Sequence, residues 1–194
     1  MGDTQSANKL VQGVGYNDKS CAALTYEGKI TKEYQLWTSI LERCYNKKFL
    51  EKNPTYLGCT VSEEFKHYHL FHAWCQKQVG FGKEGYQLDK DILVEGNKEY
   101  SSNTCCFVPR ALNSLLKKPT RDLPVGVTRY KDKFQARCSV NGIRKCLGTY
   151  NTIELAFAAY AVVKEAYIKA QAEHYKDYID FRIYEVLMNY KVKM

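Results

Sequence analysis

The chain lacks two features that define large classes of protein. It has no apolar run near the roughly 18 residues of a membrane-spanning helix, so no transmembrane segment is expected. Its first residues also lack the apolar stretch of a secretory signal. These absences predict a protein of the reducing cytoplasm that does not bind a membrane.

Paired cysteine motifs are also missing. The chain has eight cysteines but no CxxC pair, and the intervals between Cys44, Cys59, Cys75 and Cys105 fit no zinc pattern. We therefore expect buried free thiols, and zinc is not expected. A Cys/His zinc site that uses His72 and Cys75 is the alternative.

The charge is concentrated in one segment. The 194 residues suffice for one large or two small domains, with 45% hydrophobic residues and a net charge of +8. Nine Lys or Arg and two Asp lie between Ser114 and Tyr150, a surplus of seven. Such a segment favours an anionic partner, with nucleic acid ahead of an anionic membrane.

Apolar spacing predicts helices in the first half of the chain. A polar arm or short hairpin over 1–32 precedes a helix over 31–49 that Thr31 caps. A second helix is expected over 62–80, with a cap at Ser62, and it ends at Gly80. The segment that follows is expected to form, in order, a strand over 87–93, a loop over 94–103, a strand over 104–108 and a helix over 109–118.

The second half begins after the proline-containing segment 117–124, which we expect to be a boundary. Turns at Lys131–Asp132 and Asn141–Gly142 separate three short strands, because Asn-Gly is a strong hairpin signal. These strands are expected over 125–130, 134–140 and 145–150. Two helices follow, over 152–175 with Thr152 as cap, and over 177–190.

Residues 123–169 resemble the AP2 DNA-binding domain. The sequence VGVTRYKDKFQARCSVNGIRKCLGTY, followed by the pattern T-x-E-x-A-x-x-A-Y, carries this resemblance. It implies that one face of the three-stranded sheet enters the major groove of duplex DNA. The DNA-binding candidates are Arg129, Lys131, Lys133, Arg137, Arg144 and Lys145. The strands lack the tryptophan usual in this family, and the alternative is a merely solvated basic face.

Residues 34–116 resemble the HNH, or ββα-metal, nucleases of phage homing endonucleases, in which HNH and AP2 modules occur together. The matching segments are Trp37 to Cys44, Gly58–Cys59, Phe65 to Trp74, Leu88 to Asp91 and Asn97 to Cys105. In this family an Asp on the first strand and an Asn or His on the helix hold one metal ion. The matching residues are Asp89 and Asn113, and their oxygen ligands imply Mg²⁺ or Mn²⁺.

The sequence departs from the family at the general base. The family has a His after the metal-binding Asp, and this chain has Lys90. The work of the base would fall to Lys90, to Asp91 or to water. The family Asn that orients the base falls on Thr104 or its neighbour Asn103. None of the four histidines lies in the motif, which leaves open a catalytically inactive protein.

Together these patterns predict an α+β protein. Two helices precede a small ββα-metal nuclease module, and an AP2-like three-stranded antiparallel sheet with its helix and a terminal helix follow. The expected divisions are an arm over 1–32, the nuclease module over 33–118 and the AP2-like domain over 122–194. The expected function is metal-dependent cleavage of double-stranded DNA, in the host cytoplasm if the chain is phage-encoded. The alternatives are a DNA-binding regulator or anti-defence factor without activity, and a factor that binds a host or phage protein.

Overall fold

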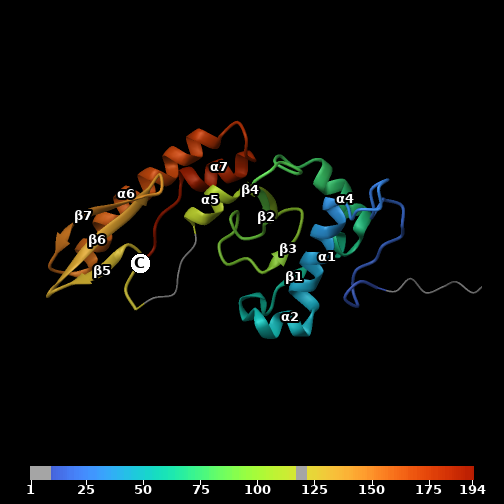
Figure 1. Cartoon of the computed structure of the whole chain (residues 1–194), viewed down its shortest axis with the longest axis horizontal. Coiled ribbons are helices and arrows are strands. Elements are labelled where there is room, and N and C mark those ends of the chain that lie inside the picture. Colours follow the sequence, from blue (N-terminus) through green and yellow to red (C-terminus); the bar gives the residue numbers. More distant parts are fainter. Residues whose placement is uncertain (1–9, 117–121) are drawn as a thin grey trace, which may run out of the picture. The chain divides into compact units, whose positions relative to one another are not determined.

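The computed structural model describes residues 10–116 and 122–194, which form an α+β fold as the sequence predicts. The chain divides into two compact units, Met1–Pro109 and Arg110–Met194, which Figure 1 shows in blue to green and in yellow-green to red. The expected boundary segment 117–124 lies mostly outside the described residues. No helix in the described part of the chain is long and apolar enough to cross a membrane.

Unit 1 contains short helices and two small sheets. Its helical segments are α1 (Lys32–Tyr45), α2 (Lys47–Lys52), the 3-10 turn η1 (Pro54–Tyr56), α3 (Glu63–Lys66) and α4 (Tyr68–Gln76). Its strands are β1 (Thr60–Val61), β2 (Tyr86–Asp89), β3 (Glu99–Tyr100) and β4 (Cys106–Pro109). β1 pairs with β3 in parallel, and β2 pairs with β4 antiparallel.

Aromatic side chains fill the core of unit 1. Trp37 on α1 is fully buried, and its indole N–H donates to the carbonyl oxygen of Phe65 at 2.8 Å. Phe65 and Phe71 meet edge to face with their ring centroids 5.0 Å apart. Each such side chain contributes on the order of 1.5–3 kcal/mol by leaving water. The core therefore holds together strands that are too short to be stable alone.

The expected helix over 62–80 is wrong in two respects. It is broken at His67, which is extended with φ −91° and ψ 116°, and it ends at Gln76 rather than Gly80. The N-terminal arm causes the break, because Tyr16 donates its N–H to the carbonyl oxygen of Lys66 and accepts from the N–H of Tyr68. Those backbone groups are thus not available to a continuous helix.

The strand expected over 87–93 is also shorter than predicted. β2 ends at Asp89, because the Oδ1 atom of that side chain accepts hydrogen bonds from the N–H groups of Asp91 and Ile92. A carboxylate that caps its own following backbone in this way turns the chain out of the sheet. The segment 94–103, expected to be a loop, contains the short strand β3.

Unit 2 is a three-stranded antiparallel sheet with a long helix on one face, as the sequence predicts. Its elements are α5 (Arg110–Leu115), β5 (Val127–Tyr130), β6 (Lys133–Val140), β7 (Ile143–Tyr150), α6 (Ile153–Tyr175) and α7 (Phe181–Met188). The core between sheet and helix consists of Val127, Ala136, Cys138, Ala156, Phe157 and Tyr160. The small Ala136 and Ala156, both fully buried, allow α6 to approach the sheet closely.

Candidate functional sites

The register of the β5–β6–β7 sheet decides which basic residues share a face. Partners across an antiparallel pair lie on the same face, and neighbours along a strand alternate between faces. Because Ala136 and Cys138 are buried against α6, Lys133 and Arg137 project from the opposite side of β6. Ser139 pairs with Arg144, which places Arg144 on that side too. We call this the open face, and it consists of Thr128, Tyr130, Lys133, Gln135, Arg137, Ser139, Arg144, Cys146 and Thr149.

The other three DNA-binding candidates lie elsewhere. Arg129 pairs with Phe134 on the α6 side, and its guanidinium carbon lies 5.6 Å from the centroid of that ring. Lys145 pairs with Cys138 and belongs to the same side. Lys131 lies in the first turn, where its φ of 54° is left-handed. Three more of the nine basic residues between Ser114 and Tyr150 lie outside the described residues, namely Lys117, Lys118 and Arg121.

Gln135 is a residue of the open face that the sequence did not single out. Its Oε1 accepts a hydrogen bond of 2.6 Å from the Nε of Arg137. The amide therefore fixes one edge of the guanidinium and leaves the terminal nitrogens, the fork with which an arginine can bind a guanine edge or a phosphate. The period-2 spacing of Gln135 and Arg137 was the signal for this pair, since it places both side chains on one face.

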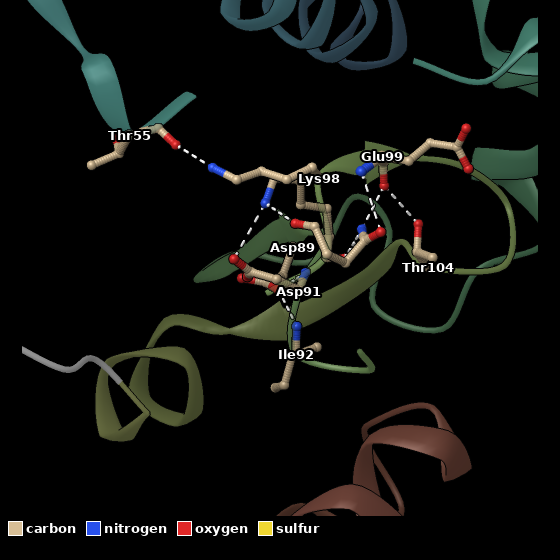
Figure 2. Close-up of polar contacts among 9 residues, drawn as sticks. Thr55, Asp89, Asp91, Ile92, Lys98, Glu99 and Thr104 are labelled. Carbon is tan, nitrogen blue, oxygen red and sulfur yellow. Dashed lines mark hydrogen bonds and ion pairs between the residues drawn. The ribbon is translucent and has the colours of Figure 1, made fainter. Parts of the chain in front are cut away.

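A pair of carboxylates lies where β2 ends, and Figure 2 shows the contacts around it. The side chain of Asp91 is 52% exposed. Burial raises the pKa of the Asp89 carboxyl above its usual value. The N–H groups of Asp91 and Ile92 oppose this shift, and the negative charge of Asp91 adds to it. Such a pair of hard oxygen donors favours a cation beside it.

Lys90 does not face solvent. Its side chain is 10% exposed, and its Nζ donates to the carbonyl oxygen of Asn97 at 2.7 Å and to Oδ2 of Asp91 at 3.2 Å. The same Nζ lies 5.9 Å from the ring centroid of Tyr100. Lys90 is therefore a buried donor within the loop that follows β2.

The side chain of Thr104 makes hydrogen bonds at β3 and at the residue after it. Its hydroxyl donates to the carbonyl oxygen of Glu99 at 2.8 Å and shares a hydrogen bond of 2.9 Å with Ser101. The structure therefore places the Thr104 side chain as a support of β3. Its neighbour Asn103 has other contacts in the structure.

The two predicted metal ligands belong to different units. Asp89 is the last residue of β2 in unit 1, and Asn113 lies on α5 in unit 2. The role of Asn113 stays a prediction. Within residues 10–116 and 122–194, no group of three or more His, Cys, Asp or Glu side chains is arranged to hold a metal ion. The donor chemistry of Asp89 and Asp91 nevertheless fits Mg²⁺ or Mn²⁺, which bind through one or two carboxylates and retain water.

Five of the six cysteines of unit 1 are buried free thiols, as their sequence spacing predicts, and Cys21 is half-buried. Burial raises the pKa of Cys44 and of Cys105 to about 12, so both remain protonated at neutral pH. All eight cysteines of the chain are free, and Cys146 on the open face is exposed.

Three of the histidines lie at the α3–α4 break or just after it: His67 is at the break, and His69 and His72 are on α4. Nδ1 of His69 lies 3.0 Å from Oδ2 of Asp18, and the ring centroids of His67 and His69 are 5.9 Å apart. Asp18 belongs to the N-terminal arm, so this contact lies between the arm and α4. The rings of His67 and His69 lie close together because the chain is extended at His67, where the helix breaks.

Comparison of the chain with protein-family models, with curated proteins and with solved structures gave no match.

Proposed function

We propose that the protein is a metal-dependent endonuclease that docks on duplex DNA through the open face of the β5–β6–β7 sheet. The observation that carries the proposal is the sheet register, which turns Lys133, Arg137 and Arg144 away from α6. A sheet face of this size suits the major groove, where base edges can be distinguished. The resemblance to the HNH–AP2 endonucleases of phages supports the same function.

Within this proposal the basic residues have separate tasks. Arg137, held by Gln135, reads a base edge, and an Arg that pairs with guanine contributes about 1–3 kcal/mol of discrimination. Lys133 and Arg144 contact phosphates, which increases affinity without regard to sequence. Arg129 and Lys145 lie on the α6 side of the sheet and are not needed for docking.

Cleavage is assigned to the carboxylates at the end of β2. Asp89 would hold Mg²⁺ or Mn²⁺, whose charge would stabilise the scissile phosphate and the leaving oxygen. Asp91, half exposed beside it, is the carboxylate that would take a proton from the attacking water. Lys90 occupies the place of the family histidine, but its Nζ already donates to Asn97 and Asp91.

A second candidate function is DNA binding without cleavage. The contacts of Lys90 favour it, because a residue that acts as a donor in the folded protein does not replace a histidine base. In this case the protein would act as a regulator or an anti-defence factor.

A nicking assay distinguishes the two candidates. Supercoiled plasmid is incubated with the protein in Mg²⁺, Mn²⁺ or EDTA, beside the variants Asp89→Ala and Lys90→Ala. Metal-dependent nicking that disappears in Asp89→Ala would establish the endonuclease. Salt-sensitive binding without nicking would establish the second candidate, and loss of binding on every DNA would remove both.

A further inference from the structure

Lys90 and Asn97 are joined twice, and the two bonds are reciprocal. The Nζ of Lys90 donates to the main-chain oxygen of Asn97 at 2.7 Å, and the Nδ2 of Asn97 donates to the main-chain oxygen of Lys90, also at 2.7 Å. Each side chain thus binds the backbone of the other residue. The two bonds close the loop between β2 and β3 without any sheet ladder.

Asn97 also connects this loop to the body of unit 1. Its Nδ2 donates to the carbonyl oxygen of Glu99 at 2.6 Å, and its Oδ1 accepts from the N–H of Glu99 at 3.2 Å. Glu99 is the first residue of β3 and pairs with Thr60 in β1. The next residue of β3, Tyr100, is 2% exposed. Asn97 is therefore fixed to the strand pair that borders the aromatic core.

Lys90, the partner of Asn97 in these bonds, contacts the carboxylates. Lys90 lies between Asp89 and Asp91 in sequence, and its Nζ holds Oδ2 of Asp91 at 3.2 Å. The N–H of Asp91 in turn donates to Oδ1 of Asp89 at 2.9 Å. A displacement of Lys90 would therefore move both carboxylates. Figure 2 shows these contacts around the labelled Asp89 and Asp91.

We propose that Lys90 and Asn97 form a clasp that positions the Asp89 carboxylate for a divalent cation and holds the Asp91 carboxylate beside it. Lys90 is then a positioning residue, and Asn97 is its partner. The inference rests on the proposed function in placing the metal ion at Asp89, with Asp91 beside it. Residues that orient metal ligands typically affect metal affinity about 10- to 100-fold when they are changed.

The first test measures Mn²⁺ alone on the full-length protein by calorimetry or electron paramagnetic resonance. Asn97→Asp keeps an oxygen that accepts from Glu99 but loses both amide donations, and Lys90→Met keeps the length of the side chain without its donors. We expect both variants to bind Mn²⁺ about tenfold or more weakly than the wild type. Wild-type affinity in both would overturn the clasp.

Lys98→Ala is the matched control. Lys98 is exposed, is one residue from Asn97 and also donates from Nζ to a main-chain oxygen, that of Thr55, at 2.8 Å. Because its Nζ is held by Thr55, its loss is expected to leave Mn²⁺ affinity unchanged. An equal loss of affinity in Lys98→Ala would show a general effect of the loop and would overturn the specific role of the clasp.

A second measurement does not depend on metal or activity. Hydrogen exchange followed by NMR measures the exchange rates of the backbone N–H groups of Asp91 and Ile92, which donate to Oδ1 of Asp89. We expect these amides to exchange at least about ten times faster in Asn97→Asp than in the wild type, because the clasp no longer restrains local opening of the loop. Unchanged exchange would overturn the clasp even if the wild type neither binds Mn²⁺ nor nicks DNA. If the wild type neither bound Mn²⁺ nor nicked DNA, the endonuclease proposal would fall, and amide exchange alone would decide whether the clasp exists.

Nicking separates the clasp from a proton-accepting role of Lys90. If Lys90→Met retains wild-type Mn²⁺ affinity and yet loses all nicking, Lys90 acts in the chemical step and the positioning role falls. If nicking falls together with affinity and is restored by saturating Mn²⁺, the positioning role stands.

Discussion

The Asn141–Gly142 turn and the loop after β2 are both closed, but by different parts of the chain. In the turn, backbone pairing of Val140 with Ile143 and left-handed φ values of 51° and 76° close the hairpin. In the loop, the side chains of Lys90 and Asn97 make the closure. The comparison teaches that a backbone turn depends on local conformational preference, whereas the loop depends on two side chains seven positions apart.

The same contrast holds for the two units. Unit 2 has a regular sheet whose register sorts its residues into two faces. Unit 1 has strands of two to four residues, and a dense aromatic core holds them in place. Unit 1 is therefore expected to depend on its aromatic core, and unit 2 on its sheet and the register of that sheet.

Trp37→Ala is expected to destabilise unit 1 by about 3–5 kcal/mol, because it empties a fully buried site. It also leaves the carbonyl oxygen of Phe65 without its indole donor. Chemical denaturation followed by near-ultraviolet circular dichroism measures the change. Trp37→Phe should cost less, and an equal cost for the two variants would contradict a cavity effect.

Gly126→Ala tests the sheet of unit 2. Gly126 has a φ of 84°, and an added Cβ would clash with the ring of Tyr160. Backbone strain and overpacking together predict a loss of about 2–4 kcal/mol, measured by thermal unfolding. Gly142→Ala is the control, since its Cβ would meet nothing within 4 Å although its φ of 76° is similar. Equal losses would show that strain alone acts at Gly126.

Arg137→Ala sharpens the assignment of faces within the sheet. We expect it to weaken binding to a preferred DNA by about 1–3 kcal/mol and to reduce discrimination between sequences. Gln135→Ala should have a smaller effect in the same direction, because it only frees the guanidinium edge. Arg129→Ala, on the α6 side, is the control. Fluorescence anisotropy at fixed salt measures all three, and equal losses at Arg129 and Arg137 would contradict the open face.

Asp89→Asn is expected to abolish metal-dependent nicking without destabilising unit 1. The pKa of Asp89 is raised mainly by burial, so its ionised form is less favourable in the folded than in the unfolded protein. The stability that the protonated carboxyl contributes is thus lost as pH rises through the raised pKa. Thermal unfolding at several pH values should show that Asn removes this pH dependence. A lower melting temperature at neutral pH in Asp89→Asn would contradict the assignment.

Local sequence determined most of unit 2. Thr152 caps α6 by accepting from the N–H of Leu155, the two turns lie where they are predicted, and the three strands differ from expectation only at their ends. These features were predictable because capping, turn chemistry and alternation depend on residues close in sequence. In unit 1 the same reasoning predicted the caps at Thr31 and Ser62.

Only the tertiary structure decided the break at His67 and the burial of Lys90. Each depends on a partner that sequence periodicity does not reveal: Tyr16 for His67, and Asn97 for Lys90. The sequence by itself determined that a lysine follows Asp89 and that six basic residues accompany the three strands. Packing and register decided that Lys90 points into the protein and that three of those six lie on the open face. The physical reason is that backbone pairing and long-range hydrogen bonds choose a side chain's surroundings only after the chain has folded.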